Sequence, residues 1–139
     1  MENINYIAWW GAVLSTLLAL IKVWELWQTR FRIEVGSGLT GNLEMGNDIH
    51  IRNLSSNPAI LCYWELFYRD HFWPLKKDTY ISSPEADTCD IRVDQHSSKT
   101  FNFNGQDHFS WSRKVMKGHK IYIRLHFAGR RPIVRKVYG

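Results

Sequence analysis

The stretch Lys120-Ile121-Tyr122-Ile123-Arg124-Leu125-His126-Phe127 alternates strictly between polar and apolar side chains. Successive side chains of a β-strand point to opposite faces of a sheet, so this pattern predicts a strand with one buried and one exposed face. The predicted buried set is Ile121, Ile123, Leu125 and Phe127, and the exposed set is Lys120, Tyr122, Arg124 and His126.

Strand patterns continue on both sides of this stretch. They cover residues 30–35, 48–52, 60–69, 89–93, 99–103 and 133–138. Gly36-Ser37-Gly38 is expected to end the first of them, and the connections 71–87 and 104–118 are each long enough for an edge strand or a short helix. Strands at this spacing, without a long amphipathic helix, predict an antiparallel β-sandwich, immunoglobulin-like, or a small barrel.

The N-terminal part has a different character. Tyr6 to Ile21 contains no charged residue, and the apolar run extends to Trp27. At about 1.5 Å per residue, a helix over 6–27 spans a hydrocarbon core of about 30 Å. Tryptophans lie near both of its ends, where amphipathic rings favour the membrane interface. We therefore expect a short N-terminus (1–5), a transmembrane helix (6–27) and a β domain (28–139).

Two other interpretations of this segment fit less well. A cleaved signal peptide has a basic start and a small-residue cleavage site, whereas this segment starts Met1-Glu2-Asn3-Ile4-Asn5 and ends in Trp-Glu-Leu-Trp. A buried helix of a soluble domain would show a polar stripe, and only Ser15 and Thr16 are polar between Tyr6 and Ile21. The sequence therefore favours a single membrane span.

The basic residues predict the orientation of that span. None precedes it, whereas Lys22, Arg30 and Arg32 lie at or after its C-terminal end. The positive-inside rule then places the β domain in the cytoplasm and the N-terminus outside the inner (plasma) membrane. In that reducing compartment Cys62 and Cys89 are expected to be free thiols, and a disulfide between them requires the opposite orientation.

One face of the predicted helix carries small residues. Gly11, Ser15 and Ala19 recur at four-residue spacing, and Lys22 lies close to the same stripe. Such a stripe allows helices to approach closely in a bilayer and to form a homo-oligomer, or it lines a narrow pore. Chance is an equally good explanation, and the two hydroxyls can bond back to their own helix.

Charge is distributed unevenly along the chain. Residues 1–107 hold nine Lys/Arg and all thirteen Asp/Glu, a net charge of −4, whereas residues 108–139 hold nine Lys/Arg and no acid, a net charge of +9. Lys120 and Arg124 flank Tyr122 on one predicted face, a pattern that can bind phosphates and stack a base. The candidate ligand-binding residues are Arg113, Lys114, Lys117, Lys120, Tyr122, Arg124, Arg130, Arg131, Arg135 and Lys136.

Three partners for this basic region remain open. A nucleotide or a short single-stranded oligonucleotide fits it, and so does pairing with the acidic remainder of the same domain or of a neighbouring subunit. Contact with anionic membrane lipid is the third.

Enzymatic signatures are missing from the sequence. It has no nucleophile elbow, glycine-rich phosphate loop or zinc-protease motif, and its six histidines lack metal-ligand spacing. His50 and His126 are expected to be solvated, and Asp90 and Asp94 to lie with Arg92 on the outer face of a strand. We expect a non-enzymatic protein without metal or cofactor.

A short N-terminus, one membrane helix and a compact β domain resemble small bacterial membrane effectors of antiphage defence. That resemblance rests on architecture and implies a cytosolic domain that senses a nucleotide and helices that assemble to breach the membrane. The first hypothesis is therefore an oligomeric effector or channel controlled by an anionic ligand. The alternative is a membrane-tethered module that binds a cytosolic protein, with the helix as an anchor only. An extracytoplasmic adhesion domain would require the reverse topology.

Overall fold

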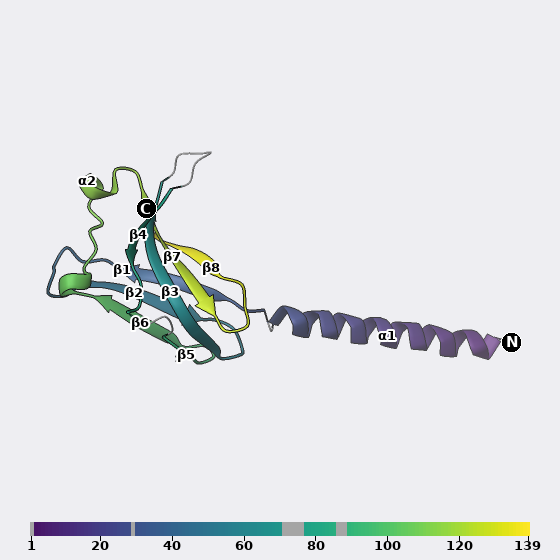
Figure 1. Ribbon diagram of the computed structural model, residues 1–139. Helices are drawn as coiled ribbons and strands as arrows, with labels where there is room; N and C mark the ends of the chain where they lie inside the picture. The colour runs from purple at the N-terminus through teal and green to yellow at the C-terminus, as the bar shows by residue number, and fades with distance from the viewer. Residues whose placement is uncertain (1, 29, 71–76, 86–88) are drawn as a thin grey trace.

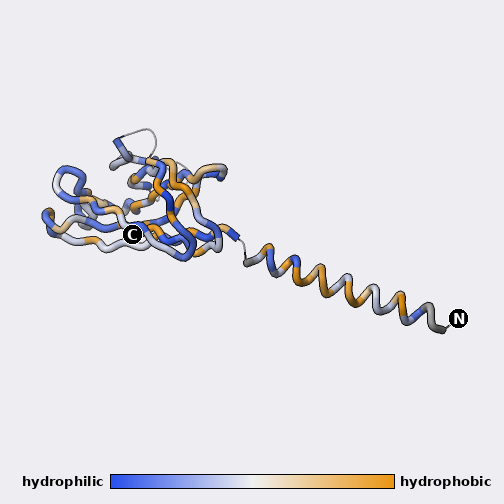
Figure 2. Tube along the Cα trace, turned by 90° about the horizontal axis from the view of Figure 1, so that it is seen from below, coloured by the Kyte–Doolittle hydropathy of each residue, from blue (hydrophilic) through white to orange (hydrophobic). Residues whose placement is uncertain are grey.

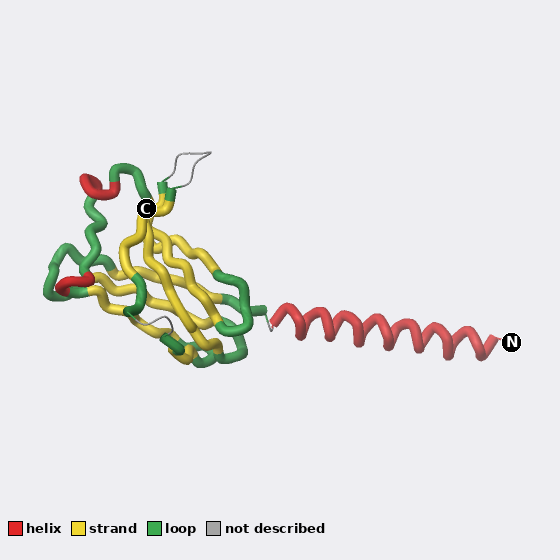
Figure 3. The backbone as a smooth tube through the Cα atoms, viewed as in Figure 1, coloured by secondary structure: helices red, strands yellow, loops and turns green. Residues whose placement is uncertain are grey.

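The structure is a computed structural model that describes residues 2–28, 30–70, 77–85 and 89–139 (Figure 1). It consists of one long N-terminal helix, α1 (Glu2–Gln28), followed by a domain of strands. The strands are β1 (Ile33–Gly38), β2 (Asn47–Asn53), β3 (Ala59–Arg69), β4 (Asp78–Ser82), β5 (Ile91–Val93), β6 (Ser98–Phe103), β7 (Lys120–Phe127) and β8 (Ile133–Tyr138). Two short helices, η1 (Gly105–Asp107) and α2 (Arg113–Met116), lie between β6 and β7 (Figure 3).

The strands form two antiparallel sheets that pack as a sandwich. The first sheet has the order β1-β2-β6, and the second has the order β4-β3-β7-β8, with β5 also paired to β3. In immunoglobulin domains the first, second and fifth strands share one sheet and the third, sixth and seventh share the other. β1, β2 and β6 face β3, β7 and β8 in the same way, so the predicted sandwich is confirmed and the barrel is excluded.

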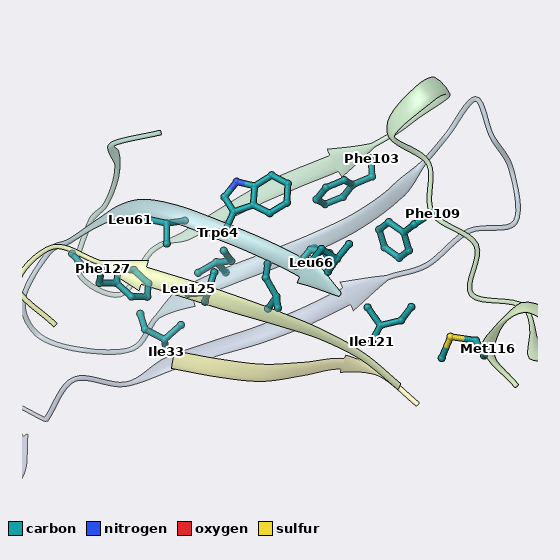
Figure 4. Packing of buried hydrophobic residues seen from close by; sticks show 14 residues of the cluster. Ile33, Leu61, Trp64, Leu66, Phe103, Phe109, Met116, Ile121, Leu125 and Phe127 are labelled. Carbon is teal, nitrogen blue, oxygen red and sulfur yellow. The ribbon is translucent and has the colours of Figure 1, made fainter. Parts of the chain in front are cut away.

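The core lies between the two sheets (Figure 4). On β7 the alternation predicted from the sequence is exact, because Ile121, Ile123, Leu125 and Phe127 are all buried. Trp64 of β3 packs edge-on against Phe103 of β6, with ring centroids 5.3 Å apart. A ring contact of this kind adds about 0.5–1.5 kcal/mol to the stability provided by burial alone.

Strand β1 differs from the prediction at both ends. It begins at Ile33 rather than Arg30, and it continues through Gly36-Ser37-Gly38, which was expected to break it. Antiparallel pairing of these three residues with His50, Ile49 and Asp48 of β2 compensates for the low strand propensity of glycine. The undecided connections are also assigned: β4 is an edge strand within 71–87, and η1 and α2 lie within 104–118.

Side-chain hydrogen bonds join β1 to β8 where the two sheets meet. The Ser37 hydroxyl donates to the Val137 carbonyl at 2.9 Å, and Arg135 Nε donates to the Ile33 carbonyl at 3.3 Å. The described strands show no backbone ladder between β1 and β8. We call this line of contact the β1–β8 seam.

Helix α1 projects away from the sandwich, and apolar residues recur along most of its length (Figure 2). Its segment Asn5–Trp27 is long and apolar enough to cross a membrane, and none of that segment's most apolar stretch is buried against the domain. Large side chains such as Leu18 and Leu20 are each 62% exposed. Exposing such a continuous apolar surface to water is strongly unfavourable, so the helix requires lipid or other helices around it.

The sandwich therefore has two ends (Figure 1). The helix-proximal end consists of the linker 30–32 and of the turns 54–58, 94–97 and 128–132, which join the strand ends nearest α1. The helix-distal end carries α2, η1 and the last residues of β8.

Candidate functional site

The outward side chains of β7 lie on the exposed face of the second sheet, beside those of β3. Antiparallel register sets Tyr122 opposite Phe67 and Arg124 opposite Glu65. On the other side of β3, the edge strand β4 sets Asp78 opposite Arg69. Residues distant in the sequence therefore meet on one surface.

These six residues form an arginine–aromatic network. Arg69 donates to both carboxylate oxygens of Asp78, at 2.7 and 2.9 Å. Arg124 reaches Glu65 at 2.6 Å and Asp78 at 3.6 Å. The network residues are Glu65, Phe67, Arg69, Asp78, Tyr122 and Arg124.

Both guanidinium groups also contact aromatic rings. They lie 5.0 and 5.1 Å from the centroid of Phe67, which is only 4% exposed although it faces outward. Phe67 and Tyr122 are nearly parallel, and Arg69 is 5.0 Å from the Tyr122 ring as well. Cation–π contacts of this kind contribute about 0.5–2 kcal/mol each.

The network is balanced in charge, with two arginines and two carboxylates. The hydrogen bond to Asp78 raises the pKa of Arg69 above its ordinary value, so this guanidinium stays charged at every physiological pH. An incoming phosphate would have to displace a carboxylate, and a base stacking on Tyr122 would meet Arg69. The arrangement thus resembles a protein-contact surface, in which arginine and aromatic residues are enriched, more than an empty anion site.

The ten residues predicted to bind a ligand do not converge. Lys114, Lys117 and Lys120 lie at the helix-distal end, where Lys120 lines a shallow hollow of about 390 Å³. Tyr122 and Arg124 belong to the arginine–aromatic network, and Lys136 lies beside them, opposite Tyr122. The remaining positions follow: Arg135 in the β1–β8 seam, Arg130 and Arg131 at the helix-proximal end, and Arg113 with a side chain outside the described part of the structure.

The pairing of Arg124 with Glu65 and Asp78 realises one of the three alternatives for the basic region, contact with acids of the same domain. Glu65, Phe67, Arg69 and Asp78 were not singled out from the sequence. Glu65, Phe67 and Arg69 do show the two-residue spacing of one strand face. Which residues of β7 lie opposite them depends on the β3–β7 register, which the sequence alone does not give.

Histidines and acids give no metal site among the described residues. His50 forms a hydrogen bond with Thr100 Oγ1 at 2.8 Å. The expectation that His126 is solvated is wrong for its Nε2 atom. His126 packs edge-on against Tyr63, with its Nε2 buried and without a hydrogen-bond partner. Asp90 and Asp94 flank the short strand β5 rather than lying on it, and Asp94 pairs with Arg92 at 2.7 Å.

The two cysteines are free thiols on neighbouring segments. The Cys89 amide donates to the Cys62 carbonyl at 2.7 Å. Burial raises the pKa of the Cys89 thiol above its ordinary value, which lowers the fraction of reactive thiolate.

On α1, Gly11, Ser15, Ala19 and Lys22 are all exposed. A Cβ added at Gly11 would meet no atom within 4 Å. Ser15 and Thr16 donate to the Ala12 carbonyl at 2.9 and 2.8 Å, so both hydroxyls are satisfied within their own helix. Lys22 forms an ion pair with Glu25 at 2.7 Å.

No protein-family model matches the chain, and no curated protein matches it either.

Proposed function

We propose that this is a single-pass membrane protein whose cytoplasmic sandwich is a non-enzymatic module that binds a protein partner. The observation that carries the proposal is the exposed apolar helix, joined to the sandwich by a short linker. An anchor of this kind keeps the sandwich next to the bilayer and raises its effective concentration there.

The arginine–aromatic network is the surface proposed to contact the partner. Its three ion pairs and stacked rings are preorganised, so little side-chain entropy is lost when a partner covers them. Tyr80, 65% exposed and opposite Phe67 on β4, extends this surface toward the edge of the sheet.

The test is site-specific photo-crosslinking in cells, with the crosslinking amino acid at Tyr80 of the full-length protein. We expect a discrete adduct from Tyr80, none from the exposed control position Gln106, and loss of the adduct in Arg124→Ala. The adduct should persist when residues 6–24 are replaced by an unrelated apolar helix. Equal crosslinking from both positions, or none from Tyr80, would contradict the proposal.

An oligomeric effector is the second candidate, and the open small-residue face of α1 favours it. With Gly11 unobstructed and both hydroxyls satisfied, two helices could approach closely along this face. The resemblance to antiphage effectors adds a nucleotide ligand, for which Lys114, Lys117 and Lys120 at the helix-distal end are candidate cations.

The two candidates predict different outcomes for the purified protein. An effector would be oligomeric in detergent, would conduct ions in liposomes, and would lose both properties on the helix replacement or on Gly11→Leu. A tethered module would be a monodisperse monomer without ion flux, whichever helix it carries.

A further inference from the structure

Four arginines gather at the helix-proximal end although they are far apart in the sequence. Arg30 and Arg32 belong to the linker after α1, whereas Arg130 and Arg131 belong to the turn between β7 and β8. Contacts hold the two segments together: the Arg130 guanidinium lies 4.1 Å from the centroid of Phe31, and Phe31 packs edge-on against Phe127. We call these four residues the proximal arginines.

The proximal arginines are exposed and carry uncompensated charge. None of them forms an ion pair with a carboxylate in the described part of the chain. The nearest turns add no free acid, because Asp94 is paired with Arg92, and Glu25 of α1 is paired with Lys22. Their situation is thus opposite to that of Arg69 and Arg124, which are neutralised within the domain.

A groove at the same end lies between the helix and the sandwich. It has a volume of about 290 Å³ and is lined by Trp24, Trp27, Arg32, Leu54, Ser56 and His96. Tryptophan rings favour the depth of the lipid headgroups, while Arg32 and Ser56 offer hydrogen-bond donors to a phosphate at that depth. Leu54 is 47% exposed and supplies an apolar wall.

We propose that the proximal arginines and this groove form a binding surface for the headgroups of anionic phospholipids. The inference rests on the membrane anchoring proposed above. Lipid is the expected ligand because the surface is continuous with the end of the apolar helix, where headgroups lie. Arginine also matches phosphate in charge and geometry. This contact fixes how the sandwich is oriented on the bilayer and leaves the arginine–aromatic network facing the cytoplasm.

The test is native mass spectrometry of the full-length protein in detergent, titrated with phosphatidylglycerol or with phosphatidylcholine of the same acyl chains. We expect phosphatidylglycerol to be retained preferentially. Arg130→Glu combined with Arg131→Glu should weaken its binding roughly tenfold or more. The matched control Lys114→Glu with Lys117→Glu, which reverses the same charge at the helix-distal end, should bind as the wild type does.

Loss of fold is checked separately. Arg130 packs on Phe31, whereas Arg131 makes no hydrogen bond or ion pair among the described residues, so Arg131→Glu alone tests lipid binding without disturbing packing. We expect this single variant to weaken phosphatidylglycerol binding by a smaller factor at unchanged melting temperature.

Three outcomes would overturn the proposal. They are equal retention of the two lipids, equal loss in the helix-distal control, and binding of ATP to the proximal arginines in competition with phosphatidylglycerol. Carbonate extraction of membranes separates this failure from failure of the anchor: an extracted protein refutes anchoring, whereas a retained protein without lipid preference refutes only the headgroup contact.

Discussion

Asn47 and Asn53 are fully buried and hold opposite ends of strand β2 to other segments. The Asn47 amide donates to the Phe109 carbonyl at 2.7 Å and thereby fixes the connection that carries η1 and α2. The Asn53 amide donates to the carbonyls of Asn57, Val93 and Asp94, and its oxygen accepts from the Ser55 amide at 3.0 Å. These side chains thus satisfy backbone groups of other segments at both ends of β2.

Asn53→Ala should therefore destabilise the sandwich strongly. Each polar group left buried without a partner costs about 1–3 kcal/mol, and we expect a total loss of about 2–4 kcal/mol. For a domain of this size the loss corresponds to a fall in melting temperature of about 10 °C or more. Thermal unfolding of the full chain in detergent, followed by near-UV circular dichroism, measures it. Asn57→Ala is the matched control, since its side chain is exposed, and an equal fall in both variants would refute the explanation.

Tyr68 makes stability depend on alkaline pH. Its phenol donates to the Ser110 carbonyl at 2.6 Å, and burial raises its pKa above the ordinary value of 10.0. The folded state therefore holds this proton more tightly than the unfolded state does. The resulting stability is complete below pH 10 and is lost as the pH rises through the raised pKa.

We expect the melting temperature of the wild type to fall more steeply between pH 9 and pH 11.5 than that of Tyr68→Phe. The exposed Tyr80 provides the control, since Tyr80→Phe should leave the steep fall in place. Parallel pH profiles for the wild type and Tyr68→Phe would show that another group causes the dependence.

At the scale of elements, β8 is held on one edge by a ladder and on the other by side chains. Its backbone pairs with β7, while Arg135 and residue Ser37 of β1 bridge the β1–β8 seam. Seam contacts of this kind contribute about 1 kcal/mol each, less than a continuous backbone ladder. β8 is thus expected to open more easily than β7.

Arg135→Met removes the hydrogen bond to the Ile33 carbonyl and keeps most of the apolar stem. We expect amide exchange in β8 to accelerate roughly fivefold, with exchange in β7 unchanged, because local opening follows local stability. Lys136→Met, the next residue and opposite Tyr122 on the outer face, is the control. Hydrogen exchange read by mass spectrometry separates the strands, and equal acceleration in β7 and β8 would refute a local role for the seam.

Some elements could be predicted from the sequence and others could not, for identifiable reasons. β7 and β8 were predicted with their exact bounds, and β3 to within one residue, because apolar alternation or a long apolar run marks a buried strand. β4 lacks such a pattern: Asp78, Thr79 and Tyr80 are all exposed, and pairing with β3 holds the strand in place. Gly36 and Gly38 likewise belong to a strand because they pair with β2.

The candidate surface was predictable in part. Outward placement of Tyr122 and Arg124 follows from alternation on β7 alone. Their partners do not, because Glu65 and Asp78 meet Arg124 only through the β3–β7 and β3–β4 registers. The composition of residues 108–139 therefore predicted a basic region, but it could not reveal that acids from earlier strands neutralise Arg124 while Arg130 and Arg131 stay unpaired among the described residues.

At the scale of the whole molecule, basic residues gather at both ends of the sandwich, and one of these groups lies next to α1. Lys22 and the proximal arginines lie where α1 meets the domain, whereas residues 1–21 contain no Lys or Arg. Folding thus adds Arg130 and Arg131 to the basic flank that predicts the orientation of the span. We expect the linker residues Arg30 and Arg32 to influence the orientation of the span more than Arg130 and Arg131 do, because flanking charges act close to the membrane and early in the chain.

We expect the sandwich to be cytoplasmic, and cysteine labelling tests this in bacterial spheroplasts with a membrane-impermeant maleimide. Gln106→Cys, at an exposed position of the helix-distal end, should react only after permeabilisation, whereas Asn3→Cys should react in intact spheroplasts. The wild-type chain sets the background, which should be low because Cys62 and Cys89 are half-buried. Reaction of Gln106→Cys from outside would place the sandwich on the other side.

The physical cause of the orientation is tested by moving the charge. Arg30→Glu and Arg32→Glu combined with Glu2→Lys transfer the basic flank to the other end of α1, and the positive-inside rule then predicts a population with the sandwich outside. In that population Gln106→Cys becomes reactive without permeabilisation, and the adjacent Cys62 and Cys89 enter an oxidising compartment. The matched control carries the same reversals at Lys114 and Lys117, far from the helix, and should keep the original topology. An unchanged labelling pattern in the first variant would mean that folding of the sandwich, rather than the linker arginines, decides which end of the helix stays inside.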